Sequence, residues 1–158
     1  MRFSKFAVAA CVIALAACGK KDDTTTTTTT TPAPTPTPAA TGAPITGETK
    51  VVQMVGDANG ARFEPAAITI KAGDGIRFEV ASLPPHNVAL NQTNVADAAK
   101  AAFKANMPNQ EMGELSGKLL NNVGDTYVIS FANVPPGVYE FDCTPHMAMN
   151  MKLKVTVQ

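Results

Sequence analysis

Residues 139 to 151 read Tyr-Glu-Phe-Asp-Cys-Thr-Pro-His-Met-Ala-Met-Asn-Met, which brings a thiol, an imidazole and thioethers together in one short stretch. Thiolate and thioether groups are soft ligands that select copper(I), zinc or iron–sulfur clusters, and imidazole binds several of the same metals. The chain contains two histidines, His86 and His146. Cys143, His146 and a methionine are therefore candidate metal ligands, and His86 is the one imidazole elsewhere in the sequence that could join them.

Hydrophobic alternation places most of these candidates beside core positions. Residues two apart in a strand lie on the same face, so each candidate shares a face with its apolar neighbours. The series are Tyr139, Phe141 and Cys143; His86, Val88 and Leu90; and Met151, Leu153, Val155 and Val157. Only His146 falls outside such a series. The pattern predicts a soft-metal site at one end of a hydrophobic β-sandwich.

The spacing of these residues resembles a known family pattern. Pro85-His86-Asn87-Val88, followed by Cys143-Thr144-Pro145-His146 and then Met151, is similar to the copper-binding pattern of the plastocyanin and pseudoazurin branch of the cupredoxins. The resemblance extends from about residue 50 to 158. It implies a blue (type 1) copper centre that carries single electrons between redox partner proteins.

The resemblance also implies a role for each site residue. His86, Cys143 and His146 would be the strong copper ligands and Met151 the weak axial one, while Asn87 would hydrogen-bond toward the cysteine loop. A methionine three residues after the histidine is instead the amicyanin pattern, so Met149 remains the alternative axial ligand. Electrons would enter and leave at the edge of His146, within an apolar patch lined by Pro85, Pro145, Met147 and Ala148.

Short alternating segments separated by turn signals predict an all-β fold over residues 48–158. Together with the resemblance, they indicate a Greek-key, antiparallel, cupredoxin-like β-sandwich of seven to eight strands. The expected strand segments are 50–55, 67–71, 76–80, 86–90, 127–131, 139–143 and 151–157. Residues 59–65 and 110–122 are expected to be loops. The alanine-rich segment 95–106 predicts one short inserted helix, ended by Met107-Pro108.

The first third of the chain has the composition of a leader and a tether. Residues 1–17 combine basic residues with a short apolar run, as in a cleaved signal peptide. Leu15-Ala16-Ala17-Cys18 resembles a bacterial lipobox, which predicts lipidation of Cys18 and a membrane anchor. Residues 18–47 are rich in threonine and proline and predict a disordered linker. We therefore expect a periplasmic or cell-surface protein. Gly19 follows the cysteine, and in Gram-negative lipoproteins this residue favours the outer membrane.

Composition narrows the function further. The formal net charge is zero, which gives no indication of nucleic-acid binding. After removal of residues 1–17, Cys143 is the only thiol of the folded domain, so no disulfide can form within it. One domain and two histidines leave nothing for a second, catalytic copper site, so we expect a monomeric electron carrier and no enzyme. The alternatives are a copper-trafficking or storage lipoprotein that uses the methionines, and an adhesion module.

Overall fold

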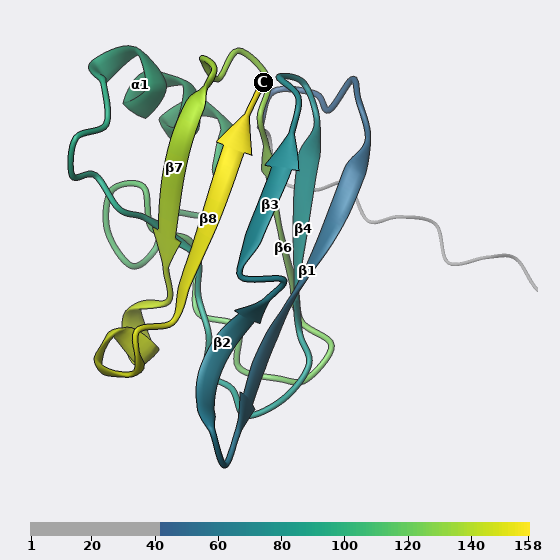
Figure 1. Ribbon diagram of the computed structural model, residues 1–158, viewed down its shortest axis with the longest axis vertical. Coiled ribbons are helices and arrows are strands. Elements are labelled where there is room, and N and C mark those ends of the chain that lie inside the picture. The colour runs from purple at the N-terminus through teal and green to yellow at the C-terminus, as the bar shows by residue number, and fades with distance from the viewer. Residues whose placement is uncertain (1–41) are drawn as a thin grey trace, which may run out of the picture. The chain divides into compact units, whose positions relative to one another are not determined.

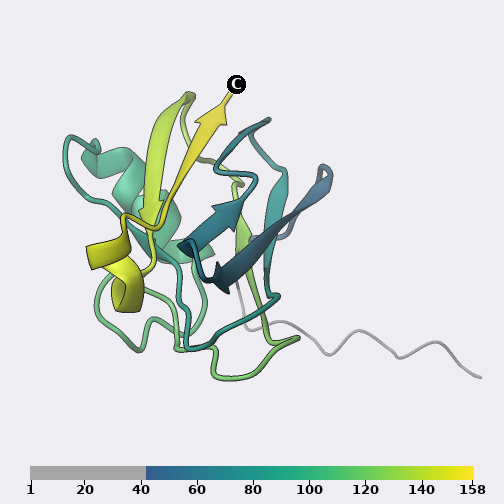
Figure 2. The same cartoon turned by 60° about the horizontal axis from the view of Figure 1, so that its bottom comes forward.

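A computed structural model describes residues 42–158, which form two facing four-stranded sheets (Figures 1 and 2). The first sheet has the order β2-β1-β4-β6 and the second β3-β8-β7-β5. The strands of the first sheet are β1 (Thr49–Asp57), β2 (Gly60–Glu64), β4 (Gly75–Val80) and β6 (Thr126–Ser130). Those of the second are β3 (Ala67–Ile70), β5 (Ala89–Leu90), β7 (Gly137–Asp142) and β8 (Lys152–Val157).

The expected all-β sandwich is confirmed, but its strands are not all antiparallel. β1 pairs in parallel with β4, and β3 pairs in parallel with β8. After β2 the chain crosses to the second sheet as β3 and then returns to the first sheet as β4, on the side of β1 away from β2. Each sheet is therefore mixed.

The expectation of a loop over residues 59–65 is wrong, because Gly60–Glu64 is strand β2. It forms a hairpin with β1, in which Asp57 pairs with Gly60 and Met54 with Phe63. Ala61 and Phe63 are buried, so this segment also alternates between core and surface. The Asn59-Gly60 pair, a hairpin signal, was present in the sequence and marks the turn.

Alternation in the last two strands is confirmed by burial. Tyr139 and Phe141 of β7, and Leu153, Val155 and Val157 of β8, all point into the core. Phe141 packs edge-on against Phe103 at a ring-centroid distance of 5.6 Å. Phe103 belongs to α1 (Asp97–Asn106), the predicted inserted helix, which begins two residues later than expected. No side chain caps the first turn of this helix. Its buried residues Phe103 and Ala99 pack into the core and attach the helix to the sandwich.

A second helical element, the 3₁₀-helix η1 (Thr144–Met149), was not expected from the sequence. It lies between β7 and β8, at the opposite end of these strands from Gln158 (Figure 1). Residues 110–122 form no named strand, as expected, but Leu120 and Ser116 make isolated bridges with His86 and Ala89. None of the helices between residues 42 and 158 has the length and hydropathy of a transmembrane span.

The proposed leader and most of the proposed linker, residues 1–41, lie outside the described residues. The described chain begins at Gly42 and is bonded to the sandwich upstream of Glu48, since the Thr46 and Gly47 amides both donate to the Gly73 carbonyl at 3.0 Å. Gly73 has a φ of +94° in the turn before β4, a conformation that glycine adopts without a steric cost. These contacts lie at the end of the sandwich that carries Gln158.

Asp74 holds this end together, so its substitution is the first test of the fold. Its carboxylate accepts the Lys71 and Glu48 amides, both at 2.9 Å, and these bonds lower the pKa of the carboxyl group. We expect Asp74→Asn to reduce the free energy of unfolding by about 1–3 kcal/mol, because one of the two part-buried amides loses its charged acceptor. Urea denaturation at neutral pH measures this difference.

The hydrogen bonds of the Asp74 carboxylate also predict how the stability of the fold depends on pH. A carboxyl group whose pKa is lower in the folded state stabilises the fold above its ordinary pKa of about 3.9. That contribution is lost as the pH falls through the lower value of the folded state. The difference in the free energy of unfolding between the wild type and Asp74→Asn should therefore shrink as the pH falls. A difference that stays constant at pH values below the ordinary pKa of aspartate would contradict this role.

Candidate metal centre

Cys143 and Met151 lie directly beyond the paired ends of β7 and β8. The last pair of this ladder joins Asp142 to Lys152. The Cys143 amide then donates to the Met151 carbonyl at 3.1 Å, so the pairing continues one step further and closes the loop between the two residues. We call residues 143–151 the ligand loop. Strand pairing therefore fixes both ends of this loop.

The 3₁₀-helix η1 carries His146 across the ligand loop. Pro145 stands in its first turn, where its missing N–H costs nothing, and the His146 amide donates to the Cys143 carbonyl at 3.0 Å. The helix ends at Asn150, which has a φ of +55° and turns the chain into β8. Asparagine tolerates this left-handed conformation better than most residues, so it suits this tight return.

His86 approaches from a different part of the chain, between β4 and β5. Its backbone forms a pair of hydrogen bonds with Leu120, of 3.0 and 2.8 Å, and its side chain is fully buried. The ring atom Nε2 lies 2.9 Å from the Ser82 carbonyl oxygen. Because a carbonyl only accepts hydrogen bonds, Nε2 carries the proton, and the lone pair of the neutral ring is on Nδ1.

The Nδ1 atoms of both histidines converge on the sulfur of Cys143. Sγ lies 3.7 Å from Nδ1 of His86 and 3.4 Å from Nδ1 of His146. These three residues form the one group of possible metal ligands of its kind among residues 42–158, with all ligand atoms within 4.8 Å of one another. A tetrahedral ion such as zinc, with bonds of about 2.3 Å to sulfur and 2.0 Å to nitrogen, places such atoms roughly 3.5 Å apart. The three donors therefore fit a single metal ion.

Burial changes the pKa of two candidate ligands, Cys143 and His146. It raises the pKa of the Cys143 thiol, although the backbone amides of Asn87 and His146 act in the opposite direction. Burial also lowers the pKa of His146, and the neighbouring His86 ring adds to this effect. The His146 ring is therefore neutral at physiological pH, as a candidate metal ligand must be. A bound cation would favour the thiolate of Cys143, which is the form of cysteine that binds metals.

Asn87 bridges the two segments that carry the ligands. Its Oδ1 accepts the Thr144 amide at 2.7 Å. Its Nδ2 donates to the Thr144 hydroxyl and to the Ser116 hydroxyl, each at 3.1 Å. Asn87 has no exposed surface and its bond to Ser116 is buried, whereas its two bonds to Thr144 are part-buried. They connect the residue after His86 with the residue after Cys143.

The methionines of the ligand loop differ sharply in exposure. Met151 is 1% exposed, whereas Met149 and Met147 are 58% and 62% exposed. Only Met151 therefore lies on the buried side of the loop. Pro85, Pro145 and Ala148 are also exposed, and His146 is half-buried. Cys18, the predicted lipidation site, lies outside the described residues.

Sequence reasoning missed three residues that support the site: Ser82, Ser116 and Thr144. Ser116 and Thr144 act through hydrogen bonds to Asn87, which is distant from both in the chain, whereas Ser82 contacts His86 through its backbone carbonyl. Such pairs leave no periodic signal. Thr144 alone had a local hint, because it directly follows Cys143.

Comparisons with known proteins agree with this geometry. The family model for copper-binding proteins of the plastocyanin/azurin family matches residues 50–158. The chain is 34% identical over 115 residues to a plastocyanin of Synechococcus sp. (strain JA-2-3B'a(2-13)), covering 72% of this chain and 76% of the relative. It is 33% identical over 107 residues to a plastocyanin of Rumex obtusifolius, covering 68% of this chain and 98% of the relative.

A solved structure gives the same result for the fold. The oxidized form of plastocyanin from Dryopteris crassirhizoma matches with a TM-score of 0.55 and 28% sequence identity, covering 68% of this chain and 99% of that structure. Fold and site together define a small β-sandwich copper protein of the electron-transfer class, a cupredoxin. The chain belongs to the copper-binding plastocyanin/azurin family.

Asn87 offers a test of how the ligand loop is held. Asn87→Ala removes the acceptor of the part-buried Thr144 amide and the donor to the buried Ser116 hydroxyl, so we expect a loss of about 1–3 kcal/mol in the free energy of unfolding. The Thr144 amide should also exchange its hydrogen faster under native conditions. Asn106→Ala is the matched control, because Asn106 is also buried and donates to the Ala132 carbonyl at 2.7 Å in another part of the fold.

Hydrogen exchange followed by NMR separates the two variants. Both should be less stable, but only Asn87→Ala should accelerate exchange at Thr144 beyond the change that global unfolding explains. Equal effects of the two variants at Thr144 would show that Asn87 contributes only to overall stability.

Proposed function

We propose that residues 42–158 hold one copper ion in a blue (type 1) centre and act as a carrier of single electrons. The convergence of two imidazole Nδ1 atoms on the buried thiol of Cys143 is the observation that carries this proposal. His86, Cys143 and His146 would be the strong ligands. Two imidazoles and one thiolate with a weak axial methionine form the ligand set of blue-copper electron-transfer sites.

The protein's residues contribute rigidity to this function. Copper supplies the one-electron chemistry when it is bound, cycling between Cu(I) and Cu(II). Asn87 and the β7–β8 pairing hold the ligands in place before the metal arrives, so little structural change accompanies a change of charge. Both histidines are used in this one centre, which supports a carrier and not an enzyme.

Met151 is the axial ligand that we propose. It is almost completely buried and its carbonyl is bonded to the Cys143 amide, which places its backbone beside the thiolate ligand. Met149, the alternative, is more than half exposed and belongs to η1. The difference in burial supports the plastocyanin and pseudoazurin pattern, in which the axial methionine lies five residues after the histidine.

Redox partner proteins would dock around His146. This ligand is half-buried, whereas His86 is fully buried, so His146 is the imidazole nearer to the surface. The exposed side chains of Pro85, Pro145, Met147 and Ala148 would form the apolar docking patch. An apolar surface of this kind permits short-lived association without requiring a strongly charged partner.

We also propose that the carrier is anchored outside the cytoplasm as a monomer. The support is the sequence pattern: a cleaved leader over residues 1–17, lipidation at Cys18 and a linker over residues 18–47 ahead of the copper domain at 48–158. A lipid on Cys18 would attach the domain to the membrane surface, with the outer membrane favoured in a Gram-negative cell. A long linker would let the domain reach partners away from its anchor.

The second candidate is copper trafficking or storage without electron transfer. The exposure of Met147 and Met149 favours it, because accessible thioethers bind copper(I). The two functions predict different spectra. A blue centre requires a copper–thiolate bond to Cys143, whereas copper(I) held by thioethers is colourless.

Replacing the proposed thiolate ligand tests the first candidate. We expect copper(II)-loaded wild type to show an intense blue absorption band and Cys143→Ser to lack it, because serine cannot form the copper–thiolate bond. Visible absorption spectra of residues 42–158 with equal copper loading measure this. Colour that survives in Cys143→Ser would contradict the ligand assignment.

A pair of methionine variants tests the axial position. We expect Met151→Gln to keep the copper but shift the reduction potential, because the axial ligand tunes the potential of such centres. Met149→Gln is the matched control, with the same chemical change at an exposed position of the same loop. Cyclic voltammetry measures the reduction potential of each variant against that of the wild type. A larger shift in Met149→Gln would assign the axial role to Met149.

A further inference from the structure

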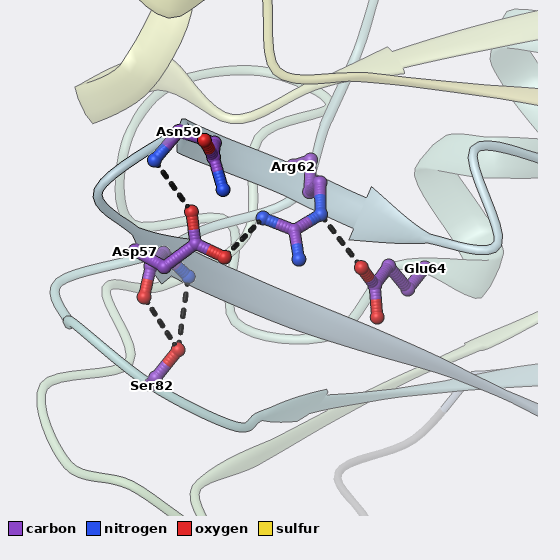
Figure 3. A network of polar contacts seen from close by, with 6 residues as sticks. Asp57, Asn59, Arg62, Glu64 and Ser82 are labelled. Atoms are coloured by element: carbon purple, nitrogen blue, oxygen red, sulfur yellow. Dashed lines mark hydrogen bonds and ion pairs between the residues drawn. The ribbon is translucent and has the colours of Figure 1, made fainter.

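The hydroxyl group of Ser82 forms two hydrogen bonds with one residue of the neighbouring strand. The Gly56 amide donates to Oγ at 3.0 Å, and the hydroxyl donates to the Gly56 carbonyl at 2.8 Å (Figure 3). The Ser82 amide also points to β1, donating to the Met54 carbonyl at 3.4 Å. A single short side chain therefore fixes the position of residue 82 against β1.

The carbonyl group of the same residue faces the metal centre. It accepts the hydrogen bond from Nε2 of His86 at 2.9 Å. The other ring nitrogen of His86 lies 3.7 Å from Sγ of Cys143. A continuous series of contacts thus runs from the Gly56 backbone through both polar groups of Ser82 to the buried imidazole.

The segment after Ser82 is conformationally strained. Leu83 has a φ of +44°, which is unfavourable for a bulky residue, and it is 60% exposed, so little burial compensates for that strain. It also lies against the bare backbone of Gly56, where an added Cβ would be 2.8 Å from the Leu83 Cβ. The bonds of Ser82 to Gly56 hold the chain in this arrangement.

The strand segment that carries Gly56 is itself braced. Next to Gly56, the Asp57 carboxylate accepts the Asn59 amide at 2.7 Å and the Arg62 guanidinium at 2.8 Å, and Arg62 also donates to Glu64 (Figure 3). The Arg62 hydrogen bond is the main cause of the lowered pKa of Asp57. These contacts tie the two strands of the β1–β2 hairpin together beside the point where Ser82 attaches.

We propose that Ser82 is a positioning residue for the metal centre: its hydroxyl, anchored on Gly56, orients the carbonyl that keeps Nδ1 of His86 directed at Cys143. The proposal rests on the proposed function for its relevance, because it takes His86 as a ligand. A purely structural hydroxyl would stabilise the loop without affecting the imidazole. The two roles differ in what happens to His86 when the hydroxyl is removed.

Ser82→Ala tests this role first in the metal-free protein. In mildly alkaline buffer, ¹⁵N NMR of the ring nitrogens should show wild-type His86 in one tautomer, with the proton on Nε2. Ser82→Ala should show a mixture of the two tautomers, because the carbonyl is no longer held in place. Ser82→Thr keeps the hydroxyl and should restore the wild-type signal.

The copper-loaded protein gives a second measurement. Residues that orient metal-binding histidines typically affect metal affinity 10–100-fold. We expect Ser82→Ala to release copper to a chelator about tenfold faster than the wild type, and Ser82→Thr to release it at the wild-type rate. Stopped-flow absorption measures the release.

Ser130→Ala is the matched control. Ser130 is 4% exposed and its Oγ accepts the Ala132 amide at 3.2 Å, so this variant also loses a buried hydroxyl contact, but it has no bond to His86. It should leave both the His86 tautomer and the copper release unchanged. Equal changes in the two alanine variants, or a wild-type tautomer in Ser82→Ala, would overturn the positioning role.

Gly56→Ala approaches the same contact from β1 and replaces Ser82→Ala if that variant does not fold. The new methyl group would collide with Leu83 and displace the attachment of Ser82, so it should produce the same mixture of tautomers. A wild-type His86 signal in folded Gly56→Ala would count against the proposal. Because the NMR measurement needs no copper, a wild type without a blue band would contradict the proposed function alone.

Discussion

The hydrogen bonds between Asn87 and Thr144 join the two segments that supply the candidate ligands. One segment carries His86 and the other carries Cys143 and His146, and the 2.7 Å bond from the Thr144 amide to Asn87 is their shortest polar link. Three hydrogen bonds of the Asn87 side chain, two to Thr144 and one to Ser116, therefore hold the two segments together. This link holds the segment of His86 beside the sulfur of Cys143, which lies 3.7 Å from Nδ1 of His86.

The two histidines have complementary environments. His86 is enclosed by the sandwich, with its second nitrogen committed to the Ser82 carbonyl, whereas His146 belongs to a surface helix and is half-buried. One imidazole is therefore fixed by the protein and the other lies close to solvent. A centre built in this way combines a rigid interior side with an outer side that a partner can approach. The burial of Met151 and the exposure of Met149 follow the same division.

The sequence predicted the features that have a local pattern. Alternation identified β7 and β8, and the spacing from Cys143 to Met151 pointed to one metal-binding loop. It did not identify β2, because the turn signal at Asn59-Gly60 is also compatible with a longer loop. It also missed the parallel pairs, which depend on how the chain crosses between sheets. Ser82 was also missed. Its role comes from backbone atoms of Gly56 and a ring nitrogen of His86, and contacts between such groups leave no trace in residue type or period.

The position of β8 within the second sheet affects how the protein must be made. β8 is the last strand of the described residues in chain order. Within its sheet it lies between β3 and β7, and β3 pairs with β8 alone. Pairing between such distant segments is slow, and it leaves edges open until the last strand arrives. A nascent or stalled polypeptide that stops short of Lys152 therefore presents two unpaired edges to proteases and to other chains. β8 must therefore be in place before the β7–β8 ladder can bring Cys143 and Met151 together.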